Sequence, residues 1–297
     1  MHEGLIGFLK MHDVEYRENV CLGEMSPIRI GGVADLVVYP QRVDLLISIL
    51  RFLKENKIKY KILGRMSNVL APDISYHSVV IRTDRLNNMR VSDSLVYVGC
   101  GCSMACIANF TAQNGLSGME ALSGIPGSIG GSIVGNAGAF GREISDLIAN
   151  VFVYDIDRRE VIELTRDECG FGYRRSDLGS QCVVLGAIFR LAISNSHSVY
   201  AEMARVRSLR IATQPTGIPS LGSTFRRVDD ISAARLIDEC GLKGHTVGGA
   251  QISVKHAGFI VNIGGAIAKD YINLSEYAAE CVYSRFAVRL QREVEIL

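Results

Sequence analysis

Residues 124–141 read Gly-Ile-Pro-Gly-Ser-Ile-Gly-Gly-Ser-Ile-Val-Gly-Asn-Ala-Gly-Ala-Phe-Gly, and seven of these eighteen residues are glycine. Glycine lets backbone N–H groups approach a ligand without obstruction by a Cβ atom, and it accepts positive φ angles. Successive N–H groups in such turns form anion-binding concavities, for which a pyrophosphate is a well-suited guest. The same composition also fits a set of tight turns between strands. Composition alone leaves both interpretations open.

The familiar nucleotide-binding motifs are missing from the chain. No Gly-Lys-Ser/Thr occurs, and Gly99-Cys100-Gly101 begins a G-x-G-x-x-G pattern that Met104 breaks. No G-x-S-x-G and no H-E-x-x-H occurs either. These absences weigh against a P-loop ATPase, a typical Rossmann dehydrogenase, an α/β-hydrolase and a zinc protease.

Composition excludes several classes of partner. With 32 Lys+Arg against 31 Asp+Glu, the formal charge is +1, which argues against a strongly basic nucleic-acid-binding surface. At 48% hydrophobic and 21% charged, the composition suits a well-cored protein, and the 297 residues suggest two domains, with one or three as alternatives. No apolar run reaches about 18 residues and no signal peptide is visible, so we expect no membrane insertion and a cytoplasmic location.

The cysteines predict neither a disulfide framework nor a metal site. Eight cysteines are few for a chain of this length. Cys100, Cys102 and Cys106 come closest to a cluster, but they lack the Cys-x-x-Cys spacing and have no histidine nearby. We interpret them as small buried thiols and expect no metal.

Hydrophobic periodicity predicts a mixture of strands and helices, with a strand–helix–strand unit at 34–63 that suggests parallel pairing. The expected strands are 34–39, 59–63, 96–98, 151–155, 161–164, 182–191, 250–254, 258–261 and 291–297. The expected helices are 43–56, 104–114, 199–212, 232–240 and 274–286.

Several polar groups are candidates for chemistry, each with a plainer interpretation beside it. The turn Gly64-Arg65-Met66-Ser67-Asn68 follows a predicted strand, where phosphate-binding turns often lie. Arg174 and Arg175 follow Tyr173, and guanidinium groups suit carboxylates, although a solvated turn fits as well. Ser223 lies in a Gly-Ser loop, where most serines are structural. Glu293 and Glu295 point to one face if 291–297 is a strand, and that face is commonly solvated.

Taken in order, these motifs resemble one family. Gly-Ile-Pro-Gly-Ser-Ile-Gly-Gly, Asn-Ala-Gly-Ala-Phe-Gly, Phe-Gly-Tyr-Arg-Arg-Ser, Leu-Gly-Ser-Thr-Phe and a terminal Arg-Glu-Val are similar to UDP-N-acetylenolpyruvoylglucosamine reductases, and the resemblance spans about residues 30–297. The segments 241–245 and 255–259 resemble the same family. The short stretch between Asp155 and Phe171 resembles its shorter subtype.

The resemblance implies an α+β fold, with a vanillyl-alcohol-oxidase-like FAD-binding region and a C-terminal substrate-binding domain. It implies FAD-binding residues 1–197 in two subdomains (about 1–90 and 91–197), a substrate-binding domain at 198–284, and a C-terminal strand at 285–297 that contributes to the active site. The implied FAD contacts are Gly64, Ser67, Asn68, Gly124, Ile125, Pro126, Gly127, Ser128, Gly131, Asn136, Ala137, Gly138 and Val184.

The implied reaction is the NADPH-dependent reduction of UDP-N-acetylglucosamine enolpyruvate to UDP-N-acetylmuramate, a step of peptidoglycan synthesis, in two half-reactions at one site of a monomer. By resemblance, Arg174 holds the substrate carboxylate, Ser223 donates a proton and Glu293, rather than Glu295, completes the site. The candidate substrate contacts are Tyr173, Arg226, Lys243 and His256, with Arg226 and Lys243 assigned to the UDP diphosphate; ordinary surface charge explains those two cations as well.

The chain departs from the family pattern at two places. Met66 stands where the family has a second glycine, so a positive φ there would cost about 1–2 kcal/mol. Arg227 and Val228 replace the usual Asn-Pro after the basic residue Arg226.

Two other functions compete with the reductase. One is a related flavin oxidase, often with covalently attached FAD. The other is a non-catalytic nucleotide-binding protein, against which the three matched residues Arg174, Ser223 and Glu293 argue.

Overall fold

The computed structural model describes residues 2–179, 182–229 and 231–297 and separates the chain into two compact units. Unit 1 comprises residues 1–18, 36–65 and 78–208, and unit 2 comprises residues 19–35, 66–77 and 209–297. Both units mix helices with sheets, so the predicted α+β class is confirmed.

The first sheet of unit 1 has the strand order β1-β2-β5-β3. β2 (Val33–Tyr39) and β3 (Tyr60–Leu63) both run parallel to β5 (Val79–Arg82), which lies between them. The four residues of β5 are all buried, as is typical of a central parallel strand. The predicted strand–helix–strand unit is therefore parallel as expected, but β5, which the sequence reading missed, separates its two strands.

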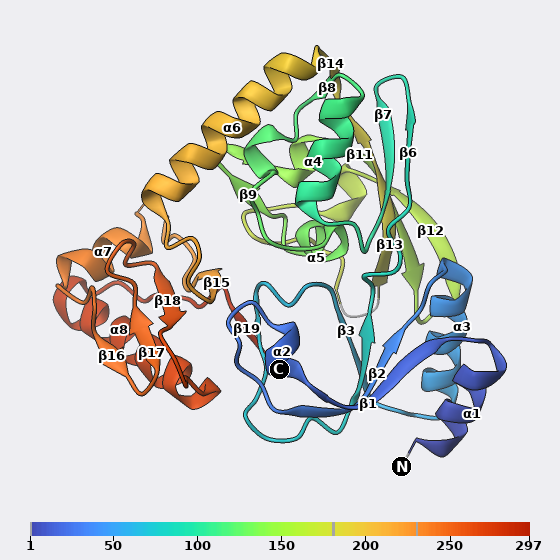
Figure 1. Cartoon of the computed structure of the whole chain (residues 1–297), viewed down its shortest axis with the longest axis horizontal. Coiled ribbons are helices and arrows are strands. Elements are labelled where there is room, and N and C mark those ends of the chain that lie inside the picture. Colours follow the sequence, from blue (N-terminus) through green and yellow to red (C-terminus); the bar gives the residue numbers. More distant parts are fainter. Residues whose placement is uncertain (1, 180–181, 230) are drawn as a thin grey trace. The chain divides into compact units, whose positions relative to one another are not determined.

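Two helices cover one face of this sheet (Figure 1). α3 (Val43–Glu55) buries Leu46, Ile49, Leu50 and Leu53, which recur at helical spacing. α1 (Glu3–Met11) buries Leu5 and Leu9 against the same core. The α1 helix was not predicted, because its apolar stretch is only two turns long.

The second sheet of unit 1 is antiparallel, with the order β12-β11-β13-β7-β6. The central strands β11 (Ile148–Asp155), β13 (Cys182–Arg190) and β7 (Leu95–Gly99) are largely buried, whereas β6 (Met89–Ser92) and β12 (Glu160–Thr165) are exposed edges. α4 (Met104–Gln113) begins at Ser103, whose hydroxyl accepts a hydrogen bond from the Cys106 amide, and Gly115 follows its end with φ +65°. That glycine occupies the C′ position that was predicted for it.

One hydrophobic cluster runs through both sheets of unit 1, from Leu5 to Leu191. The two predicted subdomains therefore share a single core. The glycine-rich block forms its own short elements on this core: α5 (Ile129–Val134) and the small hairpin β9 (Gly138–Ala139) and β10 (Arg142–Glu143). Neither α5 nor the hairpin was predicted, because glycine content lowers helix and strand propensity alike.

Unit 2 is built on the antiparallel sheet β15-β18-β17-β16, with α7 and α8 packed beside it (Figure 1). α8 (Ala268–Phe286) buries Tyr271, Leu274, Ala278 and Val282. It begins six residues before the predicted start, where the Asp270 carboxylate accepts a hydrogen bond from the Ile267 amide. The other elements are α7 (Ala233–Glu239), β15 (Ser220–Ser223), β16 (Thr246–Val247), β17 (Ala250–Ile252) and β18 (Phe259–Asn262).

Unit 2 also contains residues that were assigned to the region 1–197. Ile28, Ile30 and Leu70 lie in its hydrophobic cluster, which explains why 19–35 and 66–77 group with the C-terminal part of the chain. The predicted strand 291–297 is reduced to β19 (Glu295–Ile296), which pairs in parallel with β4 (Val69–Leu70). The compact units thus differ from the predicted domain boundaries, since a nonlocal core sets them.

The remaining elements complete the chain. They are α2 (Leu22–Met25), α6 (Ser196–Thr213), β1 (Glu15–Cys21), β8 (Leu116–Ser117), β14 (Ala192–Ile193) and three short 3₁₀ turns at Glu120–Leu122, Ile144–Asp146 and Asp167–Cys169.

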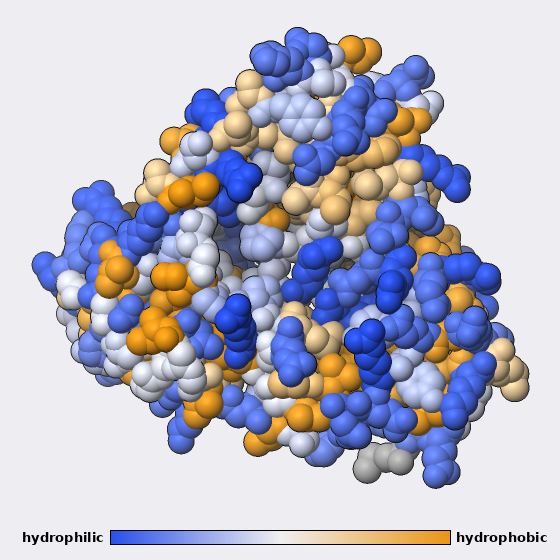
Figure 2. All heavy atoms as spheres, viewed as in Figure 1, coloured by the Kyte–Doolittle hydropathy of each residue, from blue (hydrophilic) through white to orange (hydrophobic). Residues whose placement is uncertain are grey.

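Among the described residues, no helix is long and apolar enough to span a bilayer. On the face that Figure 2 shows, hydrophobic side chains form small separate groups among hydrophilic ones.

Candidate active site

The end of β3 and the start of α5 meet at the predicted phosphate-binding residues of unit 1. A Cβ atom on Gly64 would lie 2.0 Å from Oγ of Ser128 and 3.1 Å from its Cβ. Gly130, the second residue of α5, is packed against Cys100, with a Cβ position 3.1 Å from the Cys100 Cβ. The absence of a side chain at position 64 leaves room for Ser128 here, so the structure brings together two parts of the sequence that were assigned separately to the cofactor.

The backbone N–H groups just before α5 suit an anion. The Ile129 amide donates to Cys102 and the Gly130 amide to Cys100, which fixes the loop before α5. Within residues 2–179, 182–229 and 231–297, no protein acceptor takes a hydrogen bond from the backbone N–H of Gly127 or Ser128. The Ser128 side chain is buried and does not cap the helix. This combination of a glycine cradle and unpaired amides fits the pyrophosphate of FAD.

Asn136 is the structural centre of the second half of the glycine block. It is fully buried with φ +40°, and its side-chain amide donates to Glu143 Oε2 at 2.8 Å and to the Gly172 carbonyl at 3.0 Å. Its Oδ1 accepts a hydrogen bond from the Ser145 amide. The side chain is thus occupied by the protein, and it ties the glycine block to the turn that carries Arg174.

Arg174 lies in a two-residue turn closed by reciprocal backbone hydrogen bonds between Gly172 and Arg175. Its φ is +54°, a left-handed conformation that costs a non-glycine residue about 1–2 kcal/mol. The guanidinium donates to the Gly138 carbonyl at 2.9 Å and lies 3.7 Å from Glu143 Oε1. These contacts hold the direction of the guanidinium group. Backbone strain like that at Arg174 is common at functional sites.

Ser223 ends β15 in unit 2, paired with Phe259 on β18. Gly222 before it has φ +80°, and Thr224 after it is buried. The Thr224 amide donates to the Gly258 carbonyl, and its hydroxyl accepts a hydrogen bond from Tyr271. Tyr271 is fully buried, and that burial raises the pKa of its phenol far above the usual value. The neighbours of Ser223 are therefore fixed on both sides.

Glu293 lies beside this loop in the same unit. Its backbone N–H donates to the Thr224 carbonyl at 2.9 Å, and Phe225 pairs with Arg292 as an isolated antiparallel bridge. Glu293 lies outside β19, so the prediction that it shares a strand face with Glu295 is wrong. The Glu293 backbone nevertheless bonds Thr224, the residue that follows Ser223.

The turn after Gly64 divides between the two units. Met66 has φ +54° and is 2% exposed, so a methionine does occupy a left-handed position where glycine was expected. The Asn68 side chain donates to the Glu293 carbonyl at 3.0 Å, a contact that was not foreseen. The assignment of Ser67 and Asn68 to FAD stays a prediction.

The four candidate substrate residues differ in their surroundings. The Arg226 Nε atom is buried and has no partner among the described residues, whereas Lys243 Nζ pairs with Asp238 at 2.6 Å. Burial lowers the pKa of His256, whose Nδ1 accepts from the Gly258 amide. Tyr173 is 45% exposed and packs its ring under the Arg174 guanidinium, 5.0 Å away. Arg226 is therefore the cation best suited to an additional anionic partner.

The three residues matched to catalysis fall into two groups. Arg174 belongs to unit 1, and Ser223 and Glu293 belong to unit 2. The sequence reading missed the partners that hold them, Glu143 for Arg174 and Thr224 for Glu293. No spacing or composition signal marks either residue, because each acts through a long-range contact.

The remaining residues assigned to FAD lie on several elements of unit 1, and their assignment stays a prediction. Val184 is buried on β13 opposite Val153, and Gly124, Ile125 and Pro126 precede α5. Gly131 lies in α5, and Ala137 and Gly138 lie between α5 and β10.

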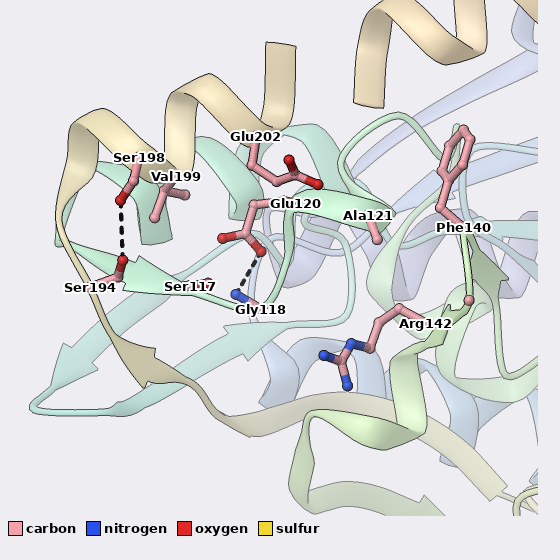
Figure 3. Close-up of a pocket in the computed structure, with 11 residues that line it drawn as sticks. Ser117, Gly118, Glu120, Ala121, Phe140, Arg142, Ser194, Ser198, Val199 and Glu202 are labelled. Atoms are coloured by element: carbon pink, nitrogen blue, oxygen red, sulfur yellow. Dashed lines mark hydrogen bonds between the residues drawn. The ribbon is translucent and has the colours of Figure 1, made fainter. Parts of the chain in front are cut away.

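A separate pocket of about 540 Å³ in unit 1 contains none of the predicted site residues (Figure 3). α6 contributes Ser198, Val199 and Glu202 to its wall. Glu120 points toward it, with one carboxylate oxygen accepting a hydrogen bond from the Gly118 amide at 2.7 Å. The pocket is lined largely by polar atoms.

The cysteine prediction is correct for two of the three clustered thiols. Burial raises the pKa of Cys100 to about 12 and that of Cys102 to about 11, whereas Cys106 is exposed. No group of three metal-ligating side chains occurs in the described part of the chain.

Comparison with known proteins identifies both parts of the sequence. A family model described as FAD binding domain matches residues 34–164, and a model described as UDP-N-acetylenolpyruvoylglucosamine reductase, C-terminal domain, matches residues 214–297. The vanillyl-alcohol-oxidase-like class expected for the FAD-binding region agrees with the first match.

Relatives align over nearly the whole chain. A UDP-N-acetylenolpyruvoylglucosamine reductase of Clostridium tetani is 38% identical over 285 residues, covering 94% of this chain and 92% of the relative. One of Listeria monocytogenes serovar 1/2a is 37% identical over 289 residues, covering 97% of each. The crystal structure of the corresponding reductase of Thermus caldophilus superimposes with a TM-score of 0.80 at 32% identity, covering 95% of this chain and 98% of that one. The chain therefore belongs to the UDP-N-acetylenolpyruvoylglucosamine reductase family and is a flavin-dependent oxidoreductase.

Proposed function

We propose that this protein reduces UDP-N-acetylglucosamine enolpyruvate to UDP-N-acetylmuramate with NADPH as the electron source, and so supplies a peptidoglycan precursor. The observation that carries the proposal is the hydrogen bond from the Glu293 amide to the Thr224 carbonyl. It joins Glu293 to Thr224, the residue after Ser223, so two of the three residues matched to catalysis lie on neighbouring segments of one unit. A non-catalytic relative would have no need to keep that arrangement together with Arg174.

FAD, when bound, supplies hydride transfer between the nicotinamide and the enolpyruvyl group. Gly64, Gly127 and Ser128 would hold its pyrophosphate through the glycine cradle and the two unpaired amides. The wider set proposed to contact FAD comprises Ser67, Asn68, Gly124, Ile125, Pro126, Gly131, Asn136, Ala137, Gly138 and Val184. For Asn136 the contact would come from its backbone, since its side chain bonds Glu143, Gly172 and Ser145.

Arg174 is proposed to grip the substrate carboxylate. Reduction of the enolpyruvyl double bond moves negative charge toward that carboxylate, and a fixed guanidinium stabilises the charge as it develops. The hydrogen bond to the Gly138 carbonyl orients the fork before substrate arrives. Glu143, 3.7 Å away, balances the arginine charge and prevents its drift toward solvent.

Ser223 is proposed to donate a proton from Oγ to the carbon beside the enol oxygen. Glu293 is proposed to complete the site next to it. Arg226, whose Nε lacks a protein partner in the described residues, is proposed to bind the UDP diphosphate with help from Lys243. Tyr173 and His256 complete the proposed substrate contacts.

The decisive experiment follows NADPH absorbance with purified, FAD-loaded protein. We expect oxidation of NADPH that depends on added UDP-N-acetylglucosamine enolpyruvate, with UDP-N-acetylmuramate as the product by mass spectrometry. Oxidation that proceeds at the same rate without the enolpyruvyl substrate would sink the proposal.

A related oxidase with covalently attached FAD is distinguished by denaturation. Since Cys100 and Cys102 are buried thiols with raised pKa values, we expect no flavin adduct on them, and acid precipitation should release the yellow colour into the supernatant. Colour that stays with the precipitated chain would favour the oxidase.

The substrates proposed here are water-soluble metabolites, so we further propose that the protein acts in the cytoplasm as a monomer. Sedimentation at the concentration of the activity assay tests the oligomeric state, and a dimeric mass would contradict it.

A further inference from the structure

We propose that Asn68 is a positioning residue that sets the place of Glu293 through the main chain. The inference rests on the proposed function of Glu293 and deepens it. Asn68 had been assigned only to the cofactor. In the structure its side-chain amide donates a hydrogen bond to the Glu293 carbonyl.

The segment around Glu293 is held from two directions within unit 2. On one side, its N–H donates to the Thr224 carbonyl at 2.9 Å, and the Arg226 amide donates to the Gln291 carbonyl at 2.9 Å. On the other side, the Asn68 Nδ2 atom donates to the Glu293 carbonyl at 3.0 Å. The two bonds on Glu293 itself fix both peptide groups that flank its Cα atom.

Those two peptide groups determine where the carboxylate can point. The direction of a side chain follows from the position of its Cα atom and the orientation of the peptides on either side. If the tail shifts so that the Glu293 Cα atom moves, the carboxylate moves with it. The Asn68 amide is a side-chain group that bonds this carbonyl.

The neighbouring contacts show that the Asn68 side-chain bond can be removed while the backbone pairing of the tail is kept. The Asn68 carbonyl accepts a hydrogen bond from the Glu295 amide at 3.0 Å, and the Leu297 amide donates to Leu70. These are backbone bonds of the β4–β19 pair, which any residue at position 68 can keep. Val294 is buried as well, so the tail keeps its anchor when the Asn68 side chain is changed.

The chemistry of position 68 provides a graded series of variants. Asn68→Ala removes the donor, whereas Asn68→Asp keeps the size but presents an ionised acceptor to the Glu293 carbonyl. Asn68→Gln keeps the donor on a side chain one methylene longer. Ser67→Ala alters the adjacent predicted flavin contact without a bond to the tail and serves as the contrast.

The first measurement is hydrogen–deuterium exchange of FAD-loaded protein, read on the peptide that contains residues 291–297. We expect faster exchange in Asn68→Ala and Asn68→Asp than in wild type, with Ser67→Ala unchanged and Asn68→Gln in between. Equal exchange in wild type, Asn68→Ala and Asn68→Asp would overturn the inference. This readout does not require turnover.

The second measurement is a double-mutant cycle on the reoxidation of the NADPH-reduced protein by enolpyruvyl substrate. We expect Asn68→Ala to slow this step about 2- to 10-fold, the effect of one hydrogen bond, and to slow it no further when Glu293 is already Gln. Additive effects would overturn the inference, because Asn68 would then act on the flavin independently of Glu293. Wild-type protein that shows no substrate-dependent reoxidation would instead overturn the proposed function, and the exchange result would still report on the Asn68 contact.

Discussion

Gly64 lies so close to Ser128 that a Cβ atom at position 64 would stand 2.0 Å from the serine Oγ. We therefore expect Gly64→Ala to force the loop before α5 away from β3, at a cost of about 1–3 kcal/mol, and to weaken FAD binding. Flavin fluorescence titration and thermal unfolding measure the two effects.

The matched control for this substitution is Gly4→Ala. No atom lies within 4 Å of a Cβ at Gly4, on helix α1, so FAD affinity should stay at the wild-type value. Adding Ser128→Ala to Gly64→Ala removes the closest contact and should restore part of the lost stability. A Gly64→Ala protein as stable as wild type, with the same FAD affinity, would show that the loop adapts.

Ser223→Ala should separate the two half-reactions. Loss of a general acid costs about 10²–10⁴-fold in the step that needs the proton. We expect flavin reduction by NADPH at the wild-type rate and a slow reoxidation by enolpyruvyl substrate, both followed by flavin absorbance in a stopped-flow instrument. If both steps slow equally, Ser223 has a structural role instead.

Arg174→Lys should reduce kcat/KM for the enolpyruvyl substrate by about 10- to 100-fold, the worth of a charged hydrogen bond. A lysine ammonium cannot reproduce a planar fork that bonds the Gly138 carbonyl and a carboxylate together. The adjacent Arg175→Lys also replaces a guanidinium by an ammonium group, but outside the proposed site. It should alter kcat/KM by less than about 3-fold. Equal losses in both variants would mean that the turn, rather than Arg174, is needed.

At position 66, replacement by glycine should destabilise the protein less than replacement by alanine. Met66→Ala keeps the left-handed backbone and loses a buried side chain, so the free energy of unfolding should fall by about 2–5 kcal/mol. Met66→Gly loses the same side chain but relieves about 1–2 kcal/mol of backbone strain. Urea unfolding of the two variants should therefore rank glycine above alanine, and the reverse order would contradict the left-handed assignment.

His256 should make the protein less stable in mild acid. Burial lowers its pKa below the usual 6.5, with a smaller contribution from Lys243 that Asp238 opposes. The unfolded chain then binds the proton more readily, so stability is fully present above about pH 6.5 and is lost as the pH falls toward the folded-state pKa. His256→Asn keeps an acceptor for the Gly258 amide and does not titrate. Between pH 7 and pH 5 its unfolding free energy should fall less than that of wild type, and equal slopes would exclude His256 as the source.

The sequence predicted the elements whose hydrophobic period is long and regular. The helix at α3 and the central strands β11 and β13 match closely, because their buried residues follow a single period. α5 was missed, since Gly130 and Gly131 lower its intrinsic propensity and the packing against Cys100 stabilises it instead. β5 is only four residues long and carries no turn signal of its own.

The candidate site, like the fold, was predicted only in part. Family motifs pointed to Arg174, Ser223 and Glu293, but they did not reveal that Glu143 lies beside Arg174 or that Thr224 and Asn68 bond the backbone of Glu293. Asn68 is 225 residues from Glu293 in the sequence. A contact of that separation leaves no trace in local pattern, so three-dimensional structure was needed to find it.

The interleaving of the two units has a consequence for how the protein acquires its structure. Each unit is made of three sequence segments that alternate, so the chain passes from one unit to the other five times. Residues 209–297 on their own would lack Ile28, Ile30 and Leu70 from their core. Unit 2 therefore cannot complete its core from residues 209–297 alone. Residues 19–35 and 66–77 are synthesised first, and they can pack into that core only after residues 209–297 have been made.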